Sequence, residues 1–377
     1  TWFGEAALAV PLGAATYVAG VAMQRETYTA EQVQGFDYAY SIPAAFAQVD
    51  LDARSWLSLS ASARADAHSV YGTFVNPRVS VLARRPDEGW LAGWTTRVSA
   101  GTGAFAPTPF VEETEVTGLT PLQPLSGLVA ERATSASVDV GGPLDVANWH
   151  LEFNGTLFGS RVTNPLQTAS VPRPFAGAMI SGIGLVNAPA PTRTVGAELL
   201  LRAERVLGGT GAVDDEDAPV LRITASYTGL RSTECNLESE AAGSGRLRSG
   251  CERQEVALTP RHALGVVTTV EQEGRSRIGL ELYYTGRQRL DANPYRANGK
   301  PYLIVGLMGE RAVTTRAGTT RAGTARLFLN LENLTDVRQT RDDRLLLPTR
   351  GLGGRWSTDA WTDLAGFTVN GGVRFGW

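Results

Sequence analysis

The chain has 377 residues, of which 43% are hydrophobic and 19% are charged, and its formal net charge is −3. This length suits one large domain or two ordinary ones. A nearly neutral chain without a basic run is not expected to bind nucleic acid. The mean hydropathy of −0.10 excludes a bundle of membrane helices.

Residues 6–24 form an uncharged stretch that is about as long as a membrane-spanning helix. Pro11 and Gly13 interrupt it, and Gly20 follows. We therefore favour two strands joined by a tight turn at Pro11-Leu12, with a helix as the alternative. A signal peptide is not expected, because the stretch lacks a positively charged start. The first residue is Thr, which indicates a processed or truncated chain.

Apolar and polar side chains alternate along much of the remaining sequence. In 54–66, for example, Leu57 and Leu59 alternate with Ser58 and Ser60. A period of two is that of a β-strand, whose successive side chains point to opposite faces. The expected strands are 2–10, 13–27, 38–51, 54–67, 74–84, 90–102, 131–141, 147–160, 179–204, 219–231, 253–271, 276–288, 300–311, 324–338 and 365–377.

The last expected strand, 365–377, shows the pattern most clearly. Phe367, Val369 and Val373 share one face, and the chain stops at an aromatic residue. The length fits a tilted membrane-crossing strand of about 9–11 residues, and aromatic rings sit well at a membrane–water boundary. We expect Phe375 and Trp377 to serve as a C-terminal signal for barrel assembly.

The connections between the expected strands alternate between short and long. Turns at 51–53, 86–88 and 273–275 contrast with long connections at 103–130 and 339–364. Short turns on the periplasmic side and long loops outside are typical of an outer-membrane barrel. The count of fifteen strands is odd, whereas single-chain bacterial barrels have even numbers. We therefore expect an N-terminal part to be missing.

Cys235 and Cys251 flank a Ser/Gly/Glu-rich segment that is typical of a loop. Two thiols across one exposed loop favour a disulfide in an external loop, and hence an oxidising compartment. Two unpaired thiols are the alternative. A metal site is not expected there, because no His or further Cys is near in the sequence.

Several expected strands carry charged residues on their polar faces. A plug with complementary charges inside a barrel would satisfy them, and those nearest the outside could instead guide a ligand. The residues concerned are Arg64, Arg78, Arg97, Glu198, Arg222, Glu281, Glu332 and Arg374. No Ser/His/Asp arrangement is evident, because His68, His150 and His262 lie near different strand ends, so we expect neither an enzyme nor a cofactor.

Two connections contain candidate ligand-facing residues. Segment 103–118 contains Phe105, Phe110, Glu112 and Glu113. The two glutamates could contact a cationic ligand or a divalent ion. Segment 338–350 contains Arg338 and Arg341, which could attract anionic ligands or lipopolysaccharide phosphates. Solvated loops are the alternative for both.

The sequence resembles the C-terminal barrel portion of the TonB-dependent outer-membrane receptors over nearly its whole length. The resemblance lies in FVNPRVSVLARRP (74–86), WTTRVSAGTGAFAPTPFVEE (94–113), LVNAPAPTRTVGAELLLRAE (185–204), VALTPRHALGVV (256–267), FLNLENLTDVRQTR (328–341) and the terminal VNGGVRFGW. Ala106 stands where the family often has Arg. The motifs are individually weak, but they occur in the family's order and strand direction.

This resemblance implies an all-β, transmembrane, antiparallel barrel of about 22 strands around a plug. Residues 1–377 would then be a C-terminal portion of the barrel, about fifteen strands without a plug, in the bacterial outer membrane. It also implies uptake of an iron–siderophore, cobalamin or glycan, with energy from the TonB–ExbB–ExbD complex acting through the missing N-terminal region. Other expected partners are outer-membrane lipid, lipopolysaccharide and the barrel-assembly machinery. A passive porin-like barrel and a soluble all-β binding protein are the alternatives.

Overall fold

The computed structural model describes residues 1–31, 35–86, 88–111, 122–175, 178–208, 218–237, 251–291, 293–314, 324–349 and 356–376. Its main sheet has 16 strands: all but β13 (Arg253–Glu255) follow one antiparallel path from β1 to β18, and β13 pairs with β12. A separate two-stranded sheet is formed by β9 (Leu166–Phe175) and β10 (Ala178–Asn187). No helix among the described residues is long and apolar enough to cross a membrane.

The strands of the main path are β1 (Trp2–Leu12), β2 (Ala15–Tyr28), β3 (Tyr38–Arg54), β4 (Leu57–His68), β5 (Gly72–Arg84), β6 (Thr95–Phe105), β7 (Glu131–Val146), β8 (Trp149–Thr163), β11 (Thr192–Val206), β12 (Val220–Cys235), β14 (His262–Gln272), β15 (Ser276–Thr285), β16 (Tyr302–Thr314), β17 (Thr324–Glu332) and β18 (Thr368–Gly376). A short 3-10 helix, η1 (Gln339–Arg341), lies in the last connection.

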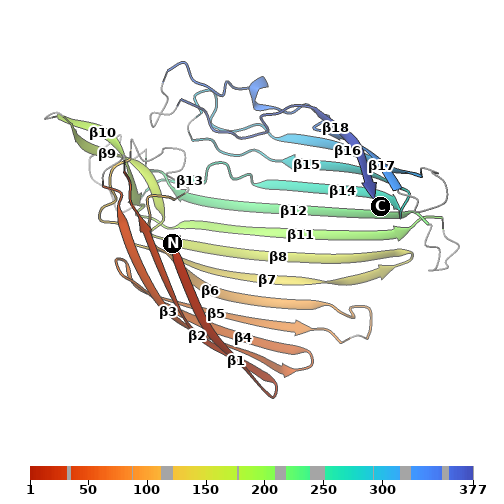
Figure 1. Cartoon of the computed structure of the whole chain (residues 1–377), viewed down its shortest axis with the longest axis horizontal. Helices are drawn as coiled ribbons and strands as arrows, with labels where there is room; N and C mark the ends of the chain where they lie inside the picture. The colour runs from red at the N-terminus through yellow and green to blue at the C-terminus, as the bar shows by residue number, and fades with distance from the viewer. Residues whose placement is uncertain are drawn as a thin grey trace.

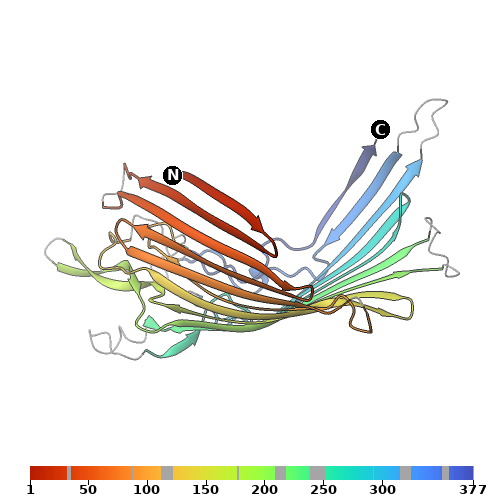
Figure 2. The ribbon, with the colours of Figure 1, turned by 90° about the horizontal axis from the view of Figure 1, so that it is seen from below.

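The sheet is curved into a trough that is open along one side (Figure 2). Its two rims are β1 and β18, and among the described strands β1 pairs with β2 alone and β18 with β17 alone. The all-β, up-and-down prediction is confirmed, and the described sheet does not close into a barrel. We call the two ends of the trough the turn end, where β1 meets β2, and the loop end, where β9 and β10 lie (Figure 1).

Three strand predictions were wrong in detail. The first turn lies at Gly13-Ala14 and not at Pro11-Leu12, because Gly13 supplies the positive φ of 60° that the turn requires. Segment 179–204 is not one strand: its first part forms β10 in the separate hairpin, and only residues after 191 join the main sheet. Segment 253–271 is interrupted around Pro260 and divides into β13 and β14.

The polar face of the sheet is its concave face. Arg64 of β4 approaches Glu5 of β1 at 3.8 Å although β2 and β3 lie between them. Adjacent strands are about 4.8 Å apart, so these side chains can meet only where the sheet curves toward them. Register then places the other polar sets of the strands on the same face.

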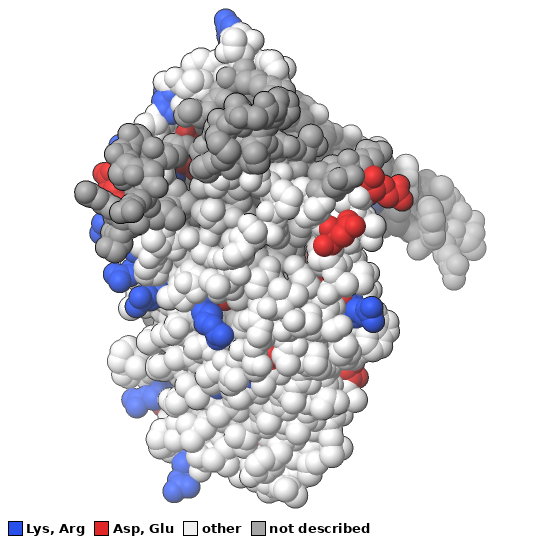
Figure 3. Space-filling model, turned by 90° about the vertical axis from the view of Figure 1, so that its left-hand side faces the viewer, with Lys and Arg blue, Asp and Glu red and all other residues white. Residues whose placement is uncertain are grey.

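The convex face is apolar and exposed. One row of directly opposed side chains crosses five strands: Leu59, Val81, Val98, Val138 and Leu157. Their exposed fractions range from 36% to 64%. Figure 3, which views the molecule from its loop-end side, shows few charged residues on the described surface there. A water-soluble sheet buries its apolar face, whereas a membrane barrel presents it to lipid.

Candidate functional site

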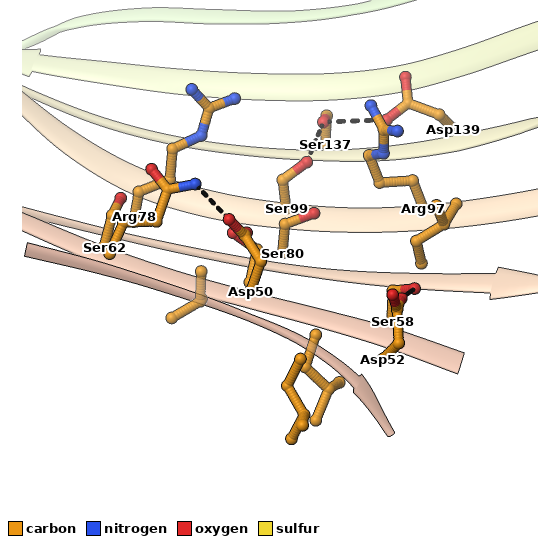
Figure 4. Close-up of a pocket in the computed structure, with 16 residues that line it drawn as sticks. Asp50, Asp52, Ser58, Ser62, Arg78, Ser80, Arg97, Ser99, Ser137 and Asp139 are labelled. Carbon is orange, nitrogen blue, oxygen red and sulfur yellow. Dashed lines mark hydrogen bonds between the residues drawn. The ribbon is translucent and has the colours of Figure 1, made fainter. Parts of the chain in front are cut away.

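A polar patch lies on the concave face where β3 to β7 run side by side (Figure 4). It lines a depression of about 620 Å³. Serine hydroxyls follow one another across the strands, and Ser99 and Ser137 lie 3.3 Å apart. Arg97 stands directly opposite Asp139, whose carboxylate accepts a hydrogen bond from Thr156 at 2.7 Å. Small hydroxyls and long charged side chains form a surface that suits water or a polar partner.

Many charged side chains on the concave face pair with one another, whereas the sequence analysis expects a plug to pair them. Arg222 contacts Glu204 at 2.9 Å and Glu271 at 3.1 Å, so one cation bridges three strands. Arg64 pairs with Asp66 at 2.8 Å. Sequence reasoning missed these pairs because they depend on register.

Of the other charged residues predicted on the polar face, some contact another described residue and some form no ion pair with one. Arg374 approaches Glu310 at 3.5 Å, and Glu332 accepts a hydrogen bond from Asn370 at 2.8 Å. Four others form no ion pair with another described residue: Arg78, Arg97, Glu198 and Glu281. These four remain able to meet an external partner.

Aromatic rings form a continuous series at the loop end. The successive contacts, with centroid distances, are Phe110–Tyr28 at 4.6 Å, Tyr28–Tyr38 at 5.9 Å, Tyr38–Tyr40 at 4.6 Å, Tyr40–His68 at 4.7 Å and His68–Phe74 at 6.3 Å. Tyr40, His68 and Phe74 are buried, whereas Phe110 is 53% exposed. The series therefore fixes the start of the long connection after β6 on the barrel wall.

His68 has a structural role within this series. Its Nδ1 accepts hydrogen bonds from the backbone N–H groups of Val70 and Tyr71, both at 3.1 Å, and so holds the turn between β4 and β5. Phe105, a predicted ligand-facing residue, ends β6 opposite Glu131 and is 47% exposed.

The Asn-Leu-x-Asp segment after β17 closes a loop. Asn333 and Asp336 both have positive φ, 52° and 50°, which Asn and Asp tolerate better than most residues. The Asn333 amide donates to the carbonyl of Val337 at 2.7 Å and accepts from its N–H at 2.9 Å. Asp336 accepts a hydrogen bond from the backbone N–H of Phe367 at 3.0 Å. These bonds place the entry of β18 beside the exit of β17.

The two predicted loop arginines also converge on this turn. Arg338 approaches Asp336 at 3.6 Å, and Arg341 pairs with the same carboxylate. The predicted anion-attracting charges are therefore partly used within the loop.

Replacing Asn333 with Ala is expected to destabilise the protein by about 1–3 kcal/mol, because Val337 loses its partners and Ala disfavours positive φ. Urea unfolding in detergent micelles measures this effect. The control is Asn330→Ala, which removes an exposed polar-face amide that contacts Asn370 and is expected to cost clearly less. An equal cost for the two variants would argue against the closing role of Asn333.

A buried carboxylate joins two loop-end connections. Asp343, 3% exposed, accepts hydrogen bonds from Arg296 Nε, Asn293 Nδ2 and Trp361 Nε1, each at 2.9 Å. Arg296 also lies over the Trp361 ring, with its Cζ 5.6 Å from the centroid. We call these four residues the Asp343 clasp. It ties the connection between β15 and β16 to the connection between β17 and β18.

The clasp rests on a fully buried amide. The Gln339 side chain donates to the carbonyl of Asp359 at 2.6 Å and accepts from the backbone N–H of Trp361 at 2.9 Å. Gln339 has no exposed surface. Residues far apart in the sequence thus form a hydrogen-bonded polar core inside a loop-end connection.

Cys235 and Cys251 form the predicted disulfide, with their Cα atoms 5.6 Å apart. Cys235 ends β12 and is 1% exposed, so the bond fastens the chain beside β13. We expect a maleimide to label neither cysteine in the unfolded, unreduced protein and both after reduction, as measured by intact mass. Labelling without reduction would contradict the disulfide.

Glu112, Glu113 and Trp377 lie outside the described residues. Phe375 lies on β18 opposite Ala325, on the convex face, and is 66% exposed. The described residues contain no group of three or more His, Cys, Asp or Glu side chains arranged to hold a metal ion.

Comparisons with known proteins agree with this architecture. The family model described as TonB dependent receptor-like, beta-barrel matches residues 5–334. No curated protein matches the chain. Among solved structures, a variant of the ferric enterobactin receptor PfeA from Pseudomonas aeruginosa is similar, with a TM-score of 0.64 and 15% identity over 98% of this chain and 53% of that one.

Two further structures share the fold. The siderophore receptor PirA from Pseudomonas aeruginosa has a TM-score of 0.56 and 14% identity, over 89% of this chain and 53% of that one. The copper transporter OprC has a TM-score of 0.60 and 15% identity, over 98% of this chain and 55% of that one. The chain thus spans about half the length of these structural relatives. Because the family model matches most of the sequence, the chain belongs to the TonB-dependent receptor-like β-barrel family.

Proposed function

We propose that the protein is an outer-membrane receptor that takes up a scarce ligand, with energy supplied through TonB. The observation that carries this proposal is the distribution of side chains on the two faces of the sheet: the convex face is apolar and exposed, and the concave face is polar. Such a sheet suits lipid on one side and a hydrated or plugged interior on the other. The two unclosed rims support a role for residues 1–377 as the C-terminal portion of the barrel.

The proposed partners follow from this arrangement. A plug domain would lie against the polar patch, where Arg78 and Arg97 have no ion pair with a described residue and can meet its carboxylates. The TonB–ExbB–ExbD complex would pull on the N-terminal part of the receptor. The barrel-assembly machinery would recognise β18 with Phe375 and Trp377. Turns then face the periplasm and the loop end faces outside.

A chelated metal ion is the ligand class to test first. The similar structures include receptors for ferric enterobactin and other siderophores and a copper transporter. We propose that Phe105, Phe110, Glu112, Glu113, Arg338 and Arg341 face the ligand, because they lie in or beside the loop-end connections. Cobalamin and glycans are the other ligand classes to include.

Uptake measurements test the proposal. Cells that lack their own receptors and express the protein are supplied with a labelled ferric siderophore, copper(II) or cobalamin, with TonB present or deleted. We expect uptake of one ligand above the vector control, and its loss when TonB is deleted. Uptake that persists without TonB would establish a passive pore instead. Recovery of the protein in the soluble fraction without detergent would overturn both the receptor and the passive-pore proposals.

A further inference from the structure

Three arginines gather on the convex face near the loop end. Arg161 of β8 stands directly opposite Arg193 of β11. Arg231 of β12 stands opposite Val195, one step along from Arg193 on the same face. Directly opposed side chains have Cβ atoms about 4.5–5.5 Å apart, and diagonal neighbours are about 7–8 Å apart. All three side chains are exposed, so three cations share one small area.

These positive charges are unbalanced among the residues that the structure describes. None of the three arginines forms an ion pair or side-chain hydrogen bond with another described residue. The next carboxylate along this face is Glu255, opposite Thr233, and Arg261 already binds it. Like charges directly opposite one another destabilise a sheet. The arrangement therefore favours an anion that lies between the guanidinium groups.

The surroundings of the cluster indicate what kind of anion this is. Val195, 57% exposed, separates Arg193 from the apolar part of β11, and Leu157, 64% exposed, precedes Arg161 on the same face of β8. The arginines thus lie at the loop-end margin of the apolar face, where their stems can run along apolar surface and their charged ends reach water. An amphiphile with an anionic head and acyl chains matches both parts.

We propose that Arg161, Arg193 and Arg231 bind the phosphates of a phosphorylated glycolipid in the outer leaflet, the lipid A part of lipopolysaccharide. The guanidinium group suits bidentate phosphate binding, and three of them can engage more than one phosphate. This proposal rests on the proposed function, because it requires the loop end to face outside. It also moves the lipid contact from Arg338 and Arg341, which pair with Asp336, to the barrel wall.

Lipid retention by the purified full chain in detergent micelles tests the site. The probe is bis-phosphorylated lipid A, and the test variant is Arg161→Gln/Arg193→Gln/Arg231→Gln. We expect its apparent affinity to be at least about tenfold weaker than that of the unmodified protein, since each arginine contributes to the attraction. The corresponding triple Lys variant keeps the charge and is expected to retain most of the binding, which separates loss of charge from misfolding.

A matched control lies at the other end of the same face. Arg205→Gln/Arg311→Gln removes two convex-face arginines at the turn end, and we expect unchanged lipid A binding. Equal binding by the triple Gln variant and the unmodified protein would overturn the proposal. The proposal would also be overturned if the unmodified protein bound phosphatidylglycerol as tightly as lipid A, or if inorganic phosphate alone displaced lipid A. Uptake is measured separately, in cells that express the unmodified protein. Uptake by that protein together with equal lipid A binding by the triple Gln variant would overturn this site alone. No uptake by that protein together with weakened lipid A binding by the variant would overturn the transport function alone.

Discussion

Replacing Leu329 with Arg is expected to destabilise the folded protein by about 2–4 kcal/mol in a bilayer. Leu329 lies in the middle of β17 on the convex face and is 50% exposed. Its neighbours on that face are Leu327 and Leu331. At this depth an arginine has no water, and its directly opposed partners, Gly309 and Gly371, offer no side chain. Urea unfolding in phospholipid vesicles measures the cost.

The next residue along the strand supplies the control. Asn330 points to the concave face, where its amide donates to Asn370 at 3.1 Å. Asn330→Gln keeps an amide in a polar environment and is expected to cost much less than Leu329→Arg. Similar losses at the two positions would contradict the assignment of the two faces.

Replacing Asp343 with Asn is expected to loosen the loop-end connections by about 3–5 kcal/mol of local stability, as for a broken buried ion pair. The change leaves the Arg296 guanidinium with Asp342 alone as a charged partner, at 3.9 Å. It also presents an amide where Asn293, Trp361 and Arg296 all donate. Hydrogen exchange at the backbone amides of Leu347 and Thr358, which bond within the same connection, measures the opening.

Asp342→Asn is the matched control for the clasp. Asp342 is the adjacent residue, its side chain is 27% exposed, and it pairs with Lys300 and lies 3.9 Å from Arg296. A partly exposed pair of this kind contributes about 1 kcal/mol or less. Exchange rates that change as much in this variant as in Asp343→Asn would contradict a special role for the buried carboxylate.

The clasp also has an expected pH dependence. Burial would by itself raise the pKa of Asp343, but hydrogen bonds from Asn293, Trp361 and Arg296, together with the Arg296 charge, hold this pKa below its usual range. A lowered folded-state pKa stabilises the connection above the unfolded value of about 3.9. This stabilisation is lost as pH falls through the folded-state pKa. Between neutral pH and about pH 5, Asp343 stays ionised, so the opening of the connection measured by hydrogen exchange should not change with its protonation. At lower pH the opening should increase, and Asp343→Asn should remove this increase.

Alternating hydrophobicity was sufficient to predict most strands, because each strand has one lipid-like and one polar face. It failed where two alternating segments adjoin. β10 and β11 are separated only by residues 188–191, so their patterns merged into one predicted strand. The expected strands do not include β9, which contains Pro172 and Pro174. A hairpin strand can tolerate these prolines because, among the described strands, β9 pairs with β10 alone.

The candidate sites were predicted unevenly for a related reason. Cys235 and Cys251 flank one loop, so their pairing was visible in the sequence. The Asp343 clasp joins residues 293, 296, 343 and 361, and no local pattern connects them. The arginine cluster depends on strand register, which sets Arg161 opposite Arg193. The sequence alone does not show that Arg161 and Arg193 stand side by side.

Site-by-site solvent access along β17 tests the two-faced sheet most directly. Single cysteines at Leu327, Phe328, Leu329 and Asn330, with the native disulfide intact, are labelled in the protein reconstituted in phospholipid vesicles. Probes at 327 and 329 should be quenched by a lipid-soluble agent, and probes at 328 and 330 by a water-soluble one. Equal access of the water-soluble agent to all four positions would contradict a lipid-facing convex face.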